Sequence, residues 1–198
     1  MRTDRRLTYV FLSLVLAAIV FAAYSNALQG GFVYDDNEQI IENAWIKDFR
    51  HLPNIFSEHS FGFAKGKEHG TTYRPLVFTV YSIEYSLFGL APRGWHLVNI
   101  AFHAVNTVLV FFVAASLFNG AGTGSGRKIL PAFAAAALFA LHPVNSEVVS
   151  WVGCVPELVY TLLCLSSLYL YMKSRELEKT RFLFVWASAA LFFVALFS

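Results

Sequence analysis

Charge is scarce in this sequence. Charged residues make up 14% of the 198 residues, whereas a soluble globular domain contains roughly 25%. Apolar residues make up 57% and aromatic residues 17%, so the chain is too hydrophobic to be disordered. Long uncharged stretches of this kind require lipid around them. The composition therefore excludes a soluble single domain and predicts an integral membrane protein.

Neither sign of charge predominates, and cysteine is rare. The 15 Lys and Arg residues nearly balance 13 Asp and Glu, for a net charge of +2, which argues against a nucleic-acid partner. Cys154 and Cys164 lack any metal-ligand spacing, and we interpret them as small buried hydrophobic residues. The glycine-rich segment 120–126 lacks the Lys-Ser or Lys-Thr of a phosphate loop. We interpret it as a flexible linker.

Apolar runs predict an all-α, polytopic membrane protein with about five transmembrane helices. The first run has 18 residues without charge, about the minimum for a spanning helix. A signal peptide cleaved near Ala27 is the alternative, but its apolar core is usually only about 7 to 15 residues. We divide residues 1–198 into a first span at 7–24, an outer loop at 25–94 and further spans within 95–198. The runs are 7–24, 97–118, 130–141, 158–172 and 182–198.

The segment from Leu76 to Leu90 is apolar but short, and it contains Glu84. If it lies in the membrane interface or is re-entrant, nine of the 15 basic residues fall in three cytoplasmic stretches, 1–6, 119–128 and 173–181. The positive-inside rule favours this arrangement. We therefore predict a cytoplasmic N-terminus and a large outer first loop with short amphipathic helices lying on the membrane.

Two adjacent carboxylates, Asp35 and Asp36, follow the first span within about ten residues. Such a pair could provide a general base beside a second acid, or could bind a cation. Capping is the alternative, because Asp-Asp-Asn with Glu38 in the first turn is typical of a helix N-terminus. One Asp can cap a helix while the other faces a cleft.

A polar stripe is predicted in the second span. At 100° per residue its members share one helix face about 100° wide. Because lipid disfavours such a face, the stripe must pack against protein or line a wet cavity, and it could serve either as interhelical glue or as a ligand site. Its members are His96, Asn99, His103, Asn106 and Thr107.

Two further polar groups are predicted on the outer side. His142 and Glu147 flank Pro143 at the end of the 130–141 run, where they could join a site with the carboxylates or simply belong to a kinked helix. Arg74 precedes Pro75 at headgroup depth, where it suits a phosphate or serves as an interfacial anchor.

Four motifs together resemble the transmembrane and tetratricopeptide-repeat O-mannosyltransferases and their bacterial relatives, which have the C-type glycosyltransferase fold. They are Phe-Val-Tyr-Asp-Asp-Asn (32–37), Tyr-Arg-Pro-Leu (73–76), Trp-His-Leu-Val-Asn-Ile-Ala-Phe-His (95–103) and Ala-Leu-His-Pro-Val-Asn-Ser-Glu-Val-Val (140–149). The resemblance implies a lipid-phosphate sugar donor on the non-cytoplasmic side, and an essential carboxylate at Asp35 with Asp36 as its partner. Such proteins normally have about nine or more spans followed by repeats. This chain has no internal repeat and stops inside an apolar run, so we expect it to be a fragment of a longer protein.

We accordingly predict a multi-pass glycosyltransferase of the bacterial inner membrane or the endoplasmic reticulum. It would move a sugar, mannose by resemblance, from a polyprenyl-phosphate donor to a protein Ser or Thr or another acceptor. Asp35 would remove the acceptor proton, and Arg74 or His142 would stabilise the leaving phosphate. A divalent metal could assist, and no other cofactor is expected. A transporter and a non-catalytic scaffold are the alternatives. The other predicted donor-binding residues are His96, Asn99, His103 and Glu147.

Overall fold

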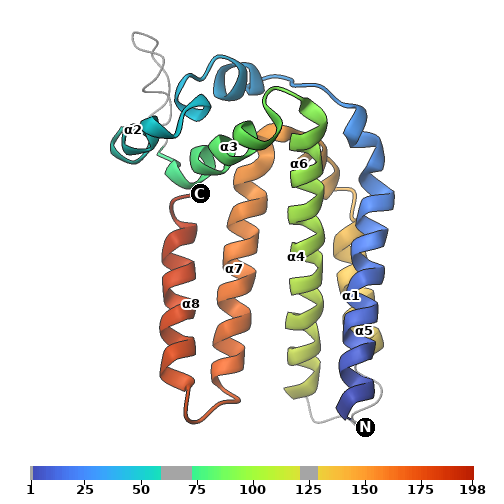
Figure 1. Cartoon of the computed structure of the whole chain (residues 1–198). Coiled ribbons are helices and arrows are strands. Elements are labelled where there is room, and N and C mark those ends of the chain that lie inside the picture. The colour runs from blue at the N-terminus through green and yellow to red at the C-terminus, as the bar shows by residue number, and fades with distance from the viewer. Residues whose placement is uncertain (1, 59–72, 121–128) are drawn as a thin grey trace.

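The structure, a computed structural model, describes residues 2–58, 73–120 and 129–198, and these residues form helices and loops without strands. Each predicted apolar run corresponds to a helix in the bundle of Figure 1. The helices α1, α4 and α7 are long and apolar enough to cross a membrane, while α5 and α8 are shorter apolar helices. The predicted all-helical membrane architecture is confirmed. The bundle consists of α1 (Arg2–Tyr24), α4 (Pro92–Gly120), α5 (Ile129–Leu141), α7 (Val155–Ser174) and α8 (Arg181–Ala195).

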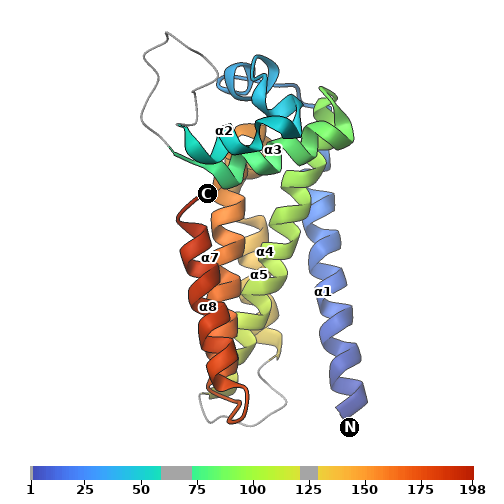
Figure 2. The same cartoon turned by 60° about the vertical axis from the view of Figure 1, so that its left-hand side comes forward.

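The helix α4 is the centre of the bundle. Helices α1, α5 and α7 pack against it, and α8 packs on α7 (Figures 1 and 2). Small residues allow close approach: Ala132, Ala136 and Ala140 recur every four residues on α5 and are fully buried. Between α7 and α8, the hydroxyls of Ser167 and Ser188 each donate to the other residue's carbonyl, at 2.8 and 2.9 Å.

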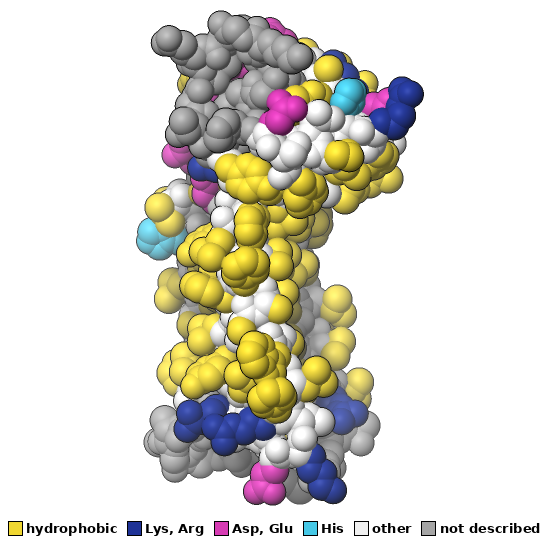
Figure 3. Space-filling model, turned by 90° about the vertical axis from the view of Figure 1, so that its left-hand side faces the viewer, with side chains coloured by type: hydrophobic (Ala, Val, Ile, Leu, Met, Phe, Trp, Pro, Cys, Tyr) yellow, Lys and Arg dark blue, Asp and Glu magenta, His cyan; other side chains and the backbone are white. Residues whose placement is uncertain are grey.

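Large apolar side chains cover the outside of the bundle. Leu14, Leu138 and Phe182 are more than 60% exposed, which suits contact with lipid rather than water. Figure 3 shows this apolar band, with Lys and Arg side chains gathered below it. We call the end of the bundle where these cations lie the basic end. Its described cations are Arg6, Lys173, Arg175, Lys179 and Arg181.

A head region, defined as residues 25–58 and 73–91, covers the opposite end of the bundle (Figure 1). It contains short helical turns and the 14-residue α3, which lies across the helix ends instead of beside them (Figures 1 and 2). This arrangement agrees with an interfacial segment at 76–90. The elements are η1 (Ser25–Gln29), η2 (Asn37–Ile41), η3 (Trp45–Lys47), η4 (Phe49–His51), α2 (Leu52–Ser57) and α3 (Pro75–Phe88).

Local sequence sets the limits of α3. Pro75 occupies its first turn, where a missing N–H costs nothing. Gly89 follows with a φ of +55°, a left-handed conformation that a glycine adopts without strain. The helix buries Tyr81 and Phe78 against Trp95 of α4 and Val155 of α7. The head region is therefore held on the bundle by an aromatic and aliphatic core.

The chain between α5 and α7 turns at the head end. Pro143 lies two residues beyond the end of α5, and two short elements, α6 (Asn145–Ser150) and η5 (Val152–Cys154), lead into α7. The linker predicted at 120–126 lies, apart from its first residue, outside the described residues. Both cysteines are free; Cys154 is buried and Cys164 is partly buried.

Candidate functional site

A tight turn at 33–36 presents the two predicted carboxylates. The Asp36 N–H donates to the Val33 carbonyl at 3.0 Å, and the Val33 N–H donates to the Asp36 carboxylate at 2.9 Å. Tyr34 has a φ of +51°, a conformation that is uncommon for a bulky residue and tends to mark functional turns. The result is an asymmetric pair, because Asp36 is fully buried while Asp35 is exposed.

The buried carboxylate joins two distant parts of the chain. The Trp151 indole N–H donates to Asp36 at 3.1 Å, and the Tyr34 ring packs edge-on against Trp151. A Cβ at Gly153 would lie only 2.9 Å from the same Asp36 oxygen, so glycine is required for this close approach. Burial raises the pKa of Asp36, while bonds from the Val33 backbone, Trp151 and the Gly153 backbone partly oppose the rise.

The Asp36 side chain does not cap a helix, which was the alternative role for this residue. Asp36 stands at the N-cap position of η2, yet its carboxylate makes no hydrogen bond to that element. Both of its oxygens are instead used by Val33 and Trp151. Asp36 therefore fixes the turn, and the turn projects its neighbour Asp35 outward.

The polar stripe of α4 is buried, and most of it bonds to backbone. Asn99 donates to the Trp151 carbonyl at 2.8 Å, and Asn106 donates to the Leu158 carbonyl at 3.0 Å. His103 Nε2 lies 3.1 Å from the Ala140 carbonyl. These three side chains thus connect α4 to the segment before η5, to α5 and to α7, which is the interhelical role.

Two members of the stripe differ from the others. The His96 ring lies against Gly30, since a Cβ at Gly30 would be 2.8 Å from His96 Nε2. The Thr107 hydroxyl is buried and has no hydrogen-bond partner within the described part of the chain. His96 therefore packs beneath the chain segment that leads into the carboxylate turn.

His142 and Glu147 are exposed in the segment between α5 and α7. The Val144 N–H donates to His142 Nδ1 at 3.2 Å, so the neutral ring carries its proton on Nε2. The Asn145 amide donates to the Phe139 carbonyl at 2.6 Å, which helps to satisfy a backbone carbonyl in the last turn of α5, just before Pro143. The segment around Pro143 thus ends a helix and also presents the Nε2–H of His142 as an exposed hydrogen-bond donor.

Arg74 lies in a different part of the head region. It is the exposed N-cap residue of α3. The next residues contact the end of α8: the Leu76 N–H donates to the Phe197 carbonyl at 3.1 Å, and the Tyr73 ring packs on Phe197. The structure thus joins Asp36 to Trp151 and Asn99, and puts Arg74 at the end of α3 that is remote from α4 (Figure 1).

Three residues of this region escaped the sequence analysis as site residues. Trp151 is the hub between Asp36 and Asn99. Tyr81 and Glu84 of α3 are 0% and 2% exposed, and the Tyr81 hydroxyl and both Glu84 oxygens lack hydrogen-bond partners within the described segments. Burial raises the pKa of Glu84 to about 8. The sequence did contain a signal for Glu84, because it is the one acidic residue in the apolar segment 76–90.

A metal ion is usually held by several His, Cys, Asp or Glu side chains that converge on one point. Within residues 2–58, 73–120 and 129–198, no group of three or more such side chains is placed to hold a metal ion.

Comparison with known proteins finds curated relatives over most of the chain. It is 36% identical over 140 residues to protein O-mannosyl-transferase Tmtc1 of Drosophila melanogaster, which covers 68% of this chain and 15% of that protein. It is 33% identical over 175 residues to the human protein O-mannosyl-transferase TMTC4, covering 84% and 24%. For the protein O-mannosyl-transferase F38B6.6 of Caenorhabditis elegans, the identity is 31% over 173 residues, covering 83% and 23%.

The chain thus spans less than a quarter of the length of each of these relatives. No family model matches it, and no solved structure matches it.

Proposed function

Because the chain belongs to the transmembrane and tetratricopeptide-repeat protein O-mannosyl-transferase family, we propose that it carries the acceptor-activating carboxylates of a membrane glycosyltransferase. The sugar is mannose, the donor is a polyprenyl-phosphate sugar, and the acceptor is a protein Ser or Thr. The printed names of the relatives support the mannosyl transfer and the protein acceptor. The lipid-linked donor follows from the family resemblance.

The observation that carries the proposal is the different environment of the two carboxylates in the same turn. Asp36 is buried and uses both oxygens to hold the turn, whereas Asp35 is exposed on the same turn. An exposed carboxylate on a fixed backbone suits a general base, because its position is defined and its lone pairs remain accessible to an acceptor hydroxyl. Asp35 removes that proton as the sugar carbon is attacked, and Asp36 keeps the turn in place.

The leaving phosphate needs positive or N–H donor groups. His142 supplies an exposed Nε2–H from the segment that also leads to Trp151, and Arg74 offers a guanidinium at the other end of α3. We assign Glu147 to the same donor site, because it is exposed in the same segment as His142. We assign His96, Asn99 and His103 an indirect role at the donor site, since they fix the backbone of Gly30, Trp151 and Ala140.

We further propose that the head region lies on the non-cytoplasmic side of a bacterial inner membrane or the endoplasmic reticulum, with the N-terminus cytoplasmic. The basic end supports this orientation, because cytoplasmic segments of membrane proteins are enriched in Lys and Arg. In this orientation the carboxylate turn, His142 and Arg74 all reach the compartment in which a lipid-linked sugar would be presented.

The test replaces Asp35 by Asn in membrane vesicles that contain the protein and a radiolabelled polyprenyl-phosphate mannose. Asn keeps the size of the side chain but does not act as a base, so we expect transfer to fall by a factor of about 10² or more. Donor binding and the helical content should be retained. Full activity in both Asp35→Asn and Asp36→Asn would refute the assignment, and movement of donor without its consumption would indicate a transporter.

A further inference from the structure

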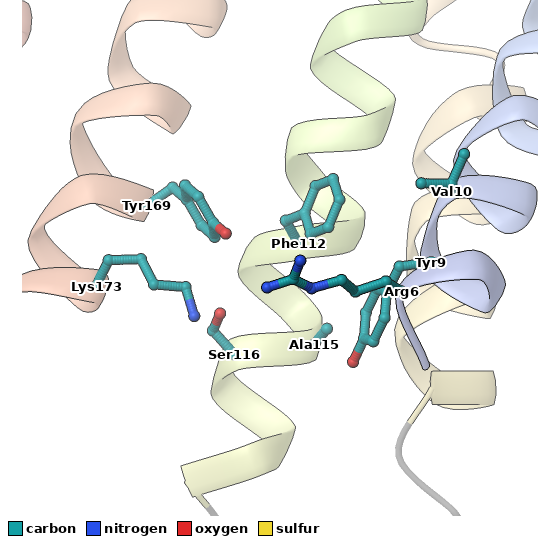
Figure 4. Close-up of a pocket in the computed structure, with 8 residues that line it drawn as sticks. All are labelled: Arg6, Tyr9, Val10, Phe112, Ala115, Ser116, Tyr169 and Lys173. Carbon is teal, nitrogen blue, oxygen red and sulfur yellow. The ribbon is translucent and has the colours of Figure 1, made fainter. Parts of the chain in front are cut away.

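A cavity of about 640 Å³ opens at the basic end of the bundle, far from the head region. Figure 4 shows it in front of α4, with α7 on one side and α1 on the other. None of its lining residues belongs to the carboxylate site. They are Arg6, Tyr9, Val10, Phe112, Ala115, Ser116, Tyr169 and Lys173.

Two cations converge on this cavity from different helices. In Figure 4 the Arg6 guanidinium extends from α1 across α4, and the Lys173 ammonium reaches toward it from α7, with the Ser116 hydroxyl close by. Tyr9 and Tyr169 add hydroxyl groups to the lining. Cations and hydroxyl donors on separate rigid helices form a preorganised setting for an anion, and phosphate oxygens match both kinds of group.

An acidic residue, Glu176, competes for Lys173. Glu176 accepts a bond from Lys173 at 2.8 Å, and its side chain is 55% exposed. An exposed pair three residues apart contributes little stability, so an arriving phosphate can share Lys173. The Tyr169 ring also lies 5.7 Å from the same ammonium. Among the side chains that the structure describes here, the two lining cations therefore exceed the one carboxylate bound to them.

The face of α4 above the cavity is apolar. Ala101, Val105, Val108, Phe112 and Ser116 fall within an arc of about 80° at 100° per residue, on the side opposite the buried polar stripe. Val105 is 49% exposed, so this face is accessible between the flanking helices. A molecule whose charged group occupies the cavity would meet a continuous hydrocarbon surface along α4.

We propose that the cavity binds an acidic phospholipid, with its phosphate between Arg6, Lys173 and Ser116 and an acyl chain along the apolar face of α4. Lys and Arg side chains gather at the edge of the apolar band (Figure 3), and this edge corresponds to the depth of a lipid headgroup. The continuous apolar face favours a lipid phosphate over a free phosphate ion. This site goes beyond the glycosyltransferase proposal and uses none of its residues.

The experiment measures binding of phosphatidylglycerol to the purified chain in neutral detergent by native mass spectrometry, with phosphatidylcholine as the neutral comparison. Each cation near a lipid headgroup contributes about fivefold in affinity. Arg6→Gln and Lys173→Gln should each weaken phosphatidylglycerol binding about fivefold, and the double variant about 25-fold. Arg175→Gln with Lys179→Gln is the matched control, because it removes the same charge from exposed positions at the same end; it should change binding less than twofold.

Charge-preserving variants separate a folding defect from loss of the site. Arg6→Lys combined with Lys173→Arg should retain most of the binding, and circular dichroism should show the same helical content in every variant. Equal losses in the lining and control variants would refute the proposal, since they would indicate attraction to the basic end as a whole. Equal binding of phosphatidylcholine, or displacement of phosphatidylglycerol by millimolar inorganic phosphate, would likewise overturn a site for an acidic lipid.

Discussion

Replacing Glu84 by Gln should stabilise the protein at neutral pH and remove most of the pH dependence of its stability between about pH 5 and 8. Glu84 is 2% exposed, both of its carboxylate oxygens lack partners within the described residues, and burial raises its pKa from 4.5 to about 8. The buried group is therefore neutral at pH 7, whereas the same group in the unfolded chain is ionised.

The size of the effect follows from the two pKa values. Below pH 4.5 the carboxyl is neutral in both states, and its full contribution to stability is present. As the pH rises, ionisation lowers the free energy of the unfolded state by about 1.4 kcal/mol per pH unit, so the protein becomes less stable. This loss levels off once the folded group also ionises, near pH 8. At pH 7 the loss amounts to about 3 kcal/mol. Gln has a similar size and does not ionise, so the variant avoids this loss.

The assay is thermal unfolding in detergent, followed by tryptophan fluorescence at pH 5, 6, 7 and 8. The melting temperatures of the wild type and Glu84→Gln should nearly coincide at pH 5 and diverge by several degrees at pH 7 to 8, with the variant higher. Glu178→Gln, which changes an exposed carboxyl near the basic end, should follow the wild type. Parallel curves for the wild type and Glu84→Gln would refute the reasoning, because they would mean that Glu84 ionises freely in the folded protein.

Two further predictions concern the carboxylate turn and the orientation of the bundle. Trp151→Phe removes the indole N–H that bonds to Asp36, so it should destabilise the fold by about 1 to 3 kcal/mol in thermal unfolding at pH 7, while Trp186→Phe on the exposed face of α8 should not. Equal melting temperatures for the two would contradict the bridging role of Trp151. Single cysteines at Glu178 and Glu42, in a Cys154→Ala, Cys164→Ala background, should be labelled by an impermeant maleimide only from the cytoplasmic and only from the opposite side, respectively. Labelling of both from one side would contradict the orientation.

The helices follow from the sequence by simple rules. The apolar runs at 7–24, 97–118 and 158–172 lie within α1, α4 and α7, because a segment long enough to cross a bilayer must satisfy its own backbone hydrogen bonds. The predicted interfacial segment at 76–90 corresponds to α3. Its composition alone did not decide between a span and an interfacial helix, and the distribution of Lys and Arg along the whole chain favoured the interfacial assignment.

Helical periodicity was enough to locate the polar stripe of α4, but it could not show whether the stripe binds a ligand or bonds to other helices. Periodicity places Asn99, His103 and Asn106 on one face of α4. Which acceptors they meet depends on how α5, α6 and α7 pack around α4, and these contacts join residues 37 to 52 positions apart in sequence. The choice between a ligand site and interhelical bonding was therefore open until the packing was known.

The sequence by itself determined the membrane class, the place of the apolar helices and the carboxylates as candidates, since these depend on composition and local periodicity. The family resemblance implied different roles for Asp35 and Asp36, but only the tertiary structure shows their physical difference, because Asp36 is buried by a bond to Trp151, 115 residues away in sequence. It alone also brought Arg6 and Lys173 to one cavity. In each case the burial and the partners of a charged group decide its role. Segments that are distant in sequence create this environment when they pack together.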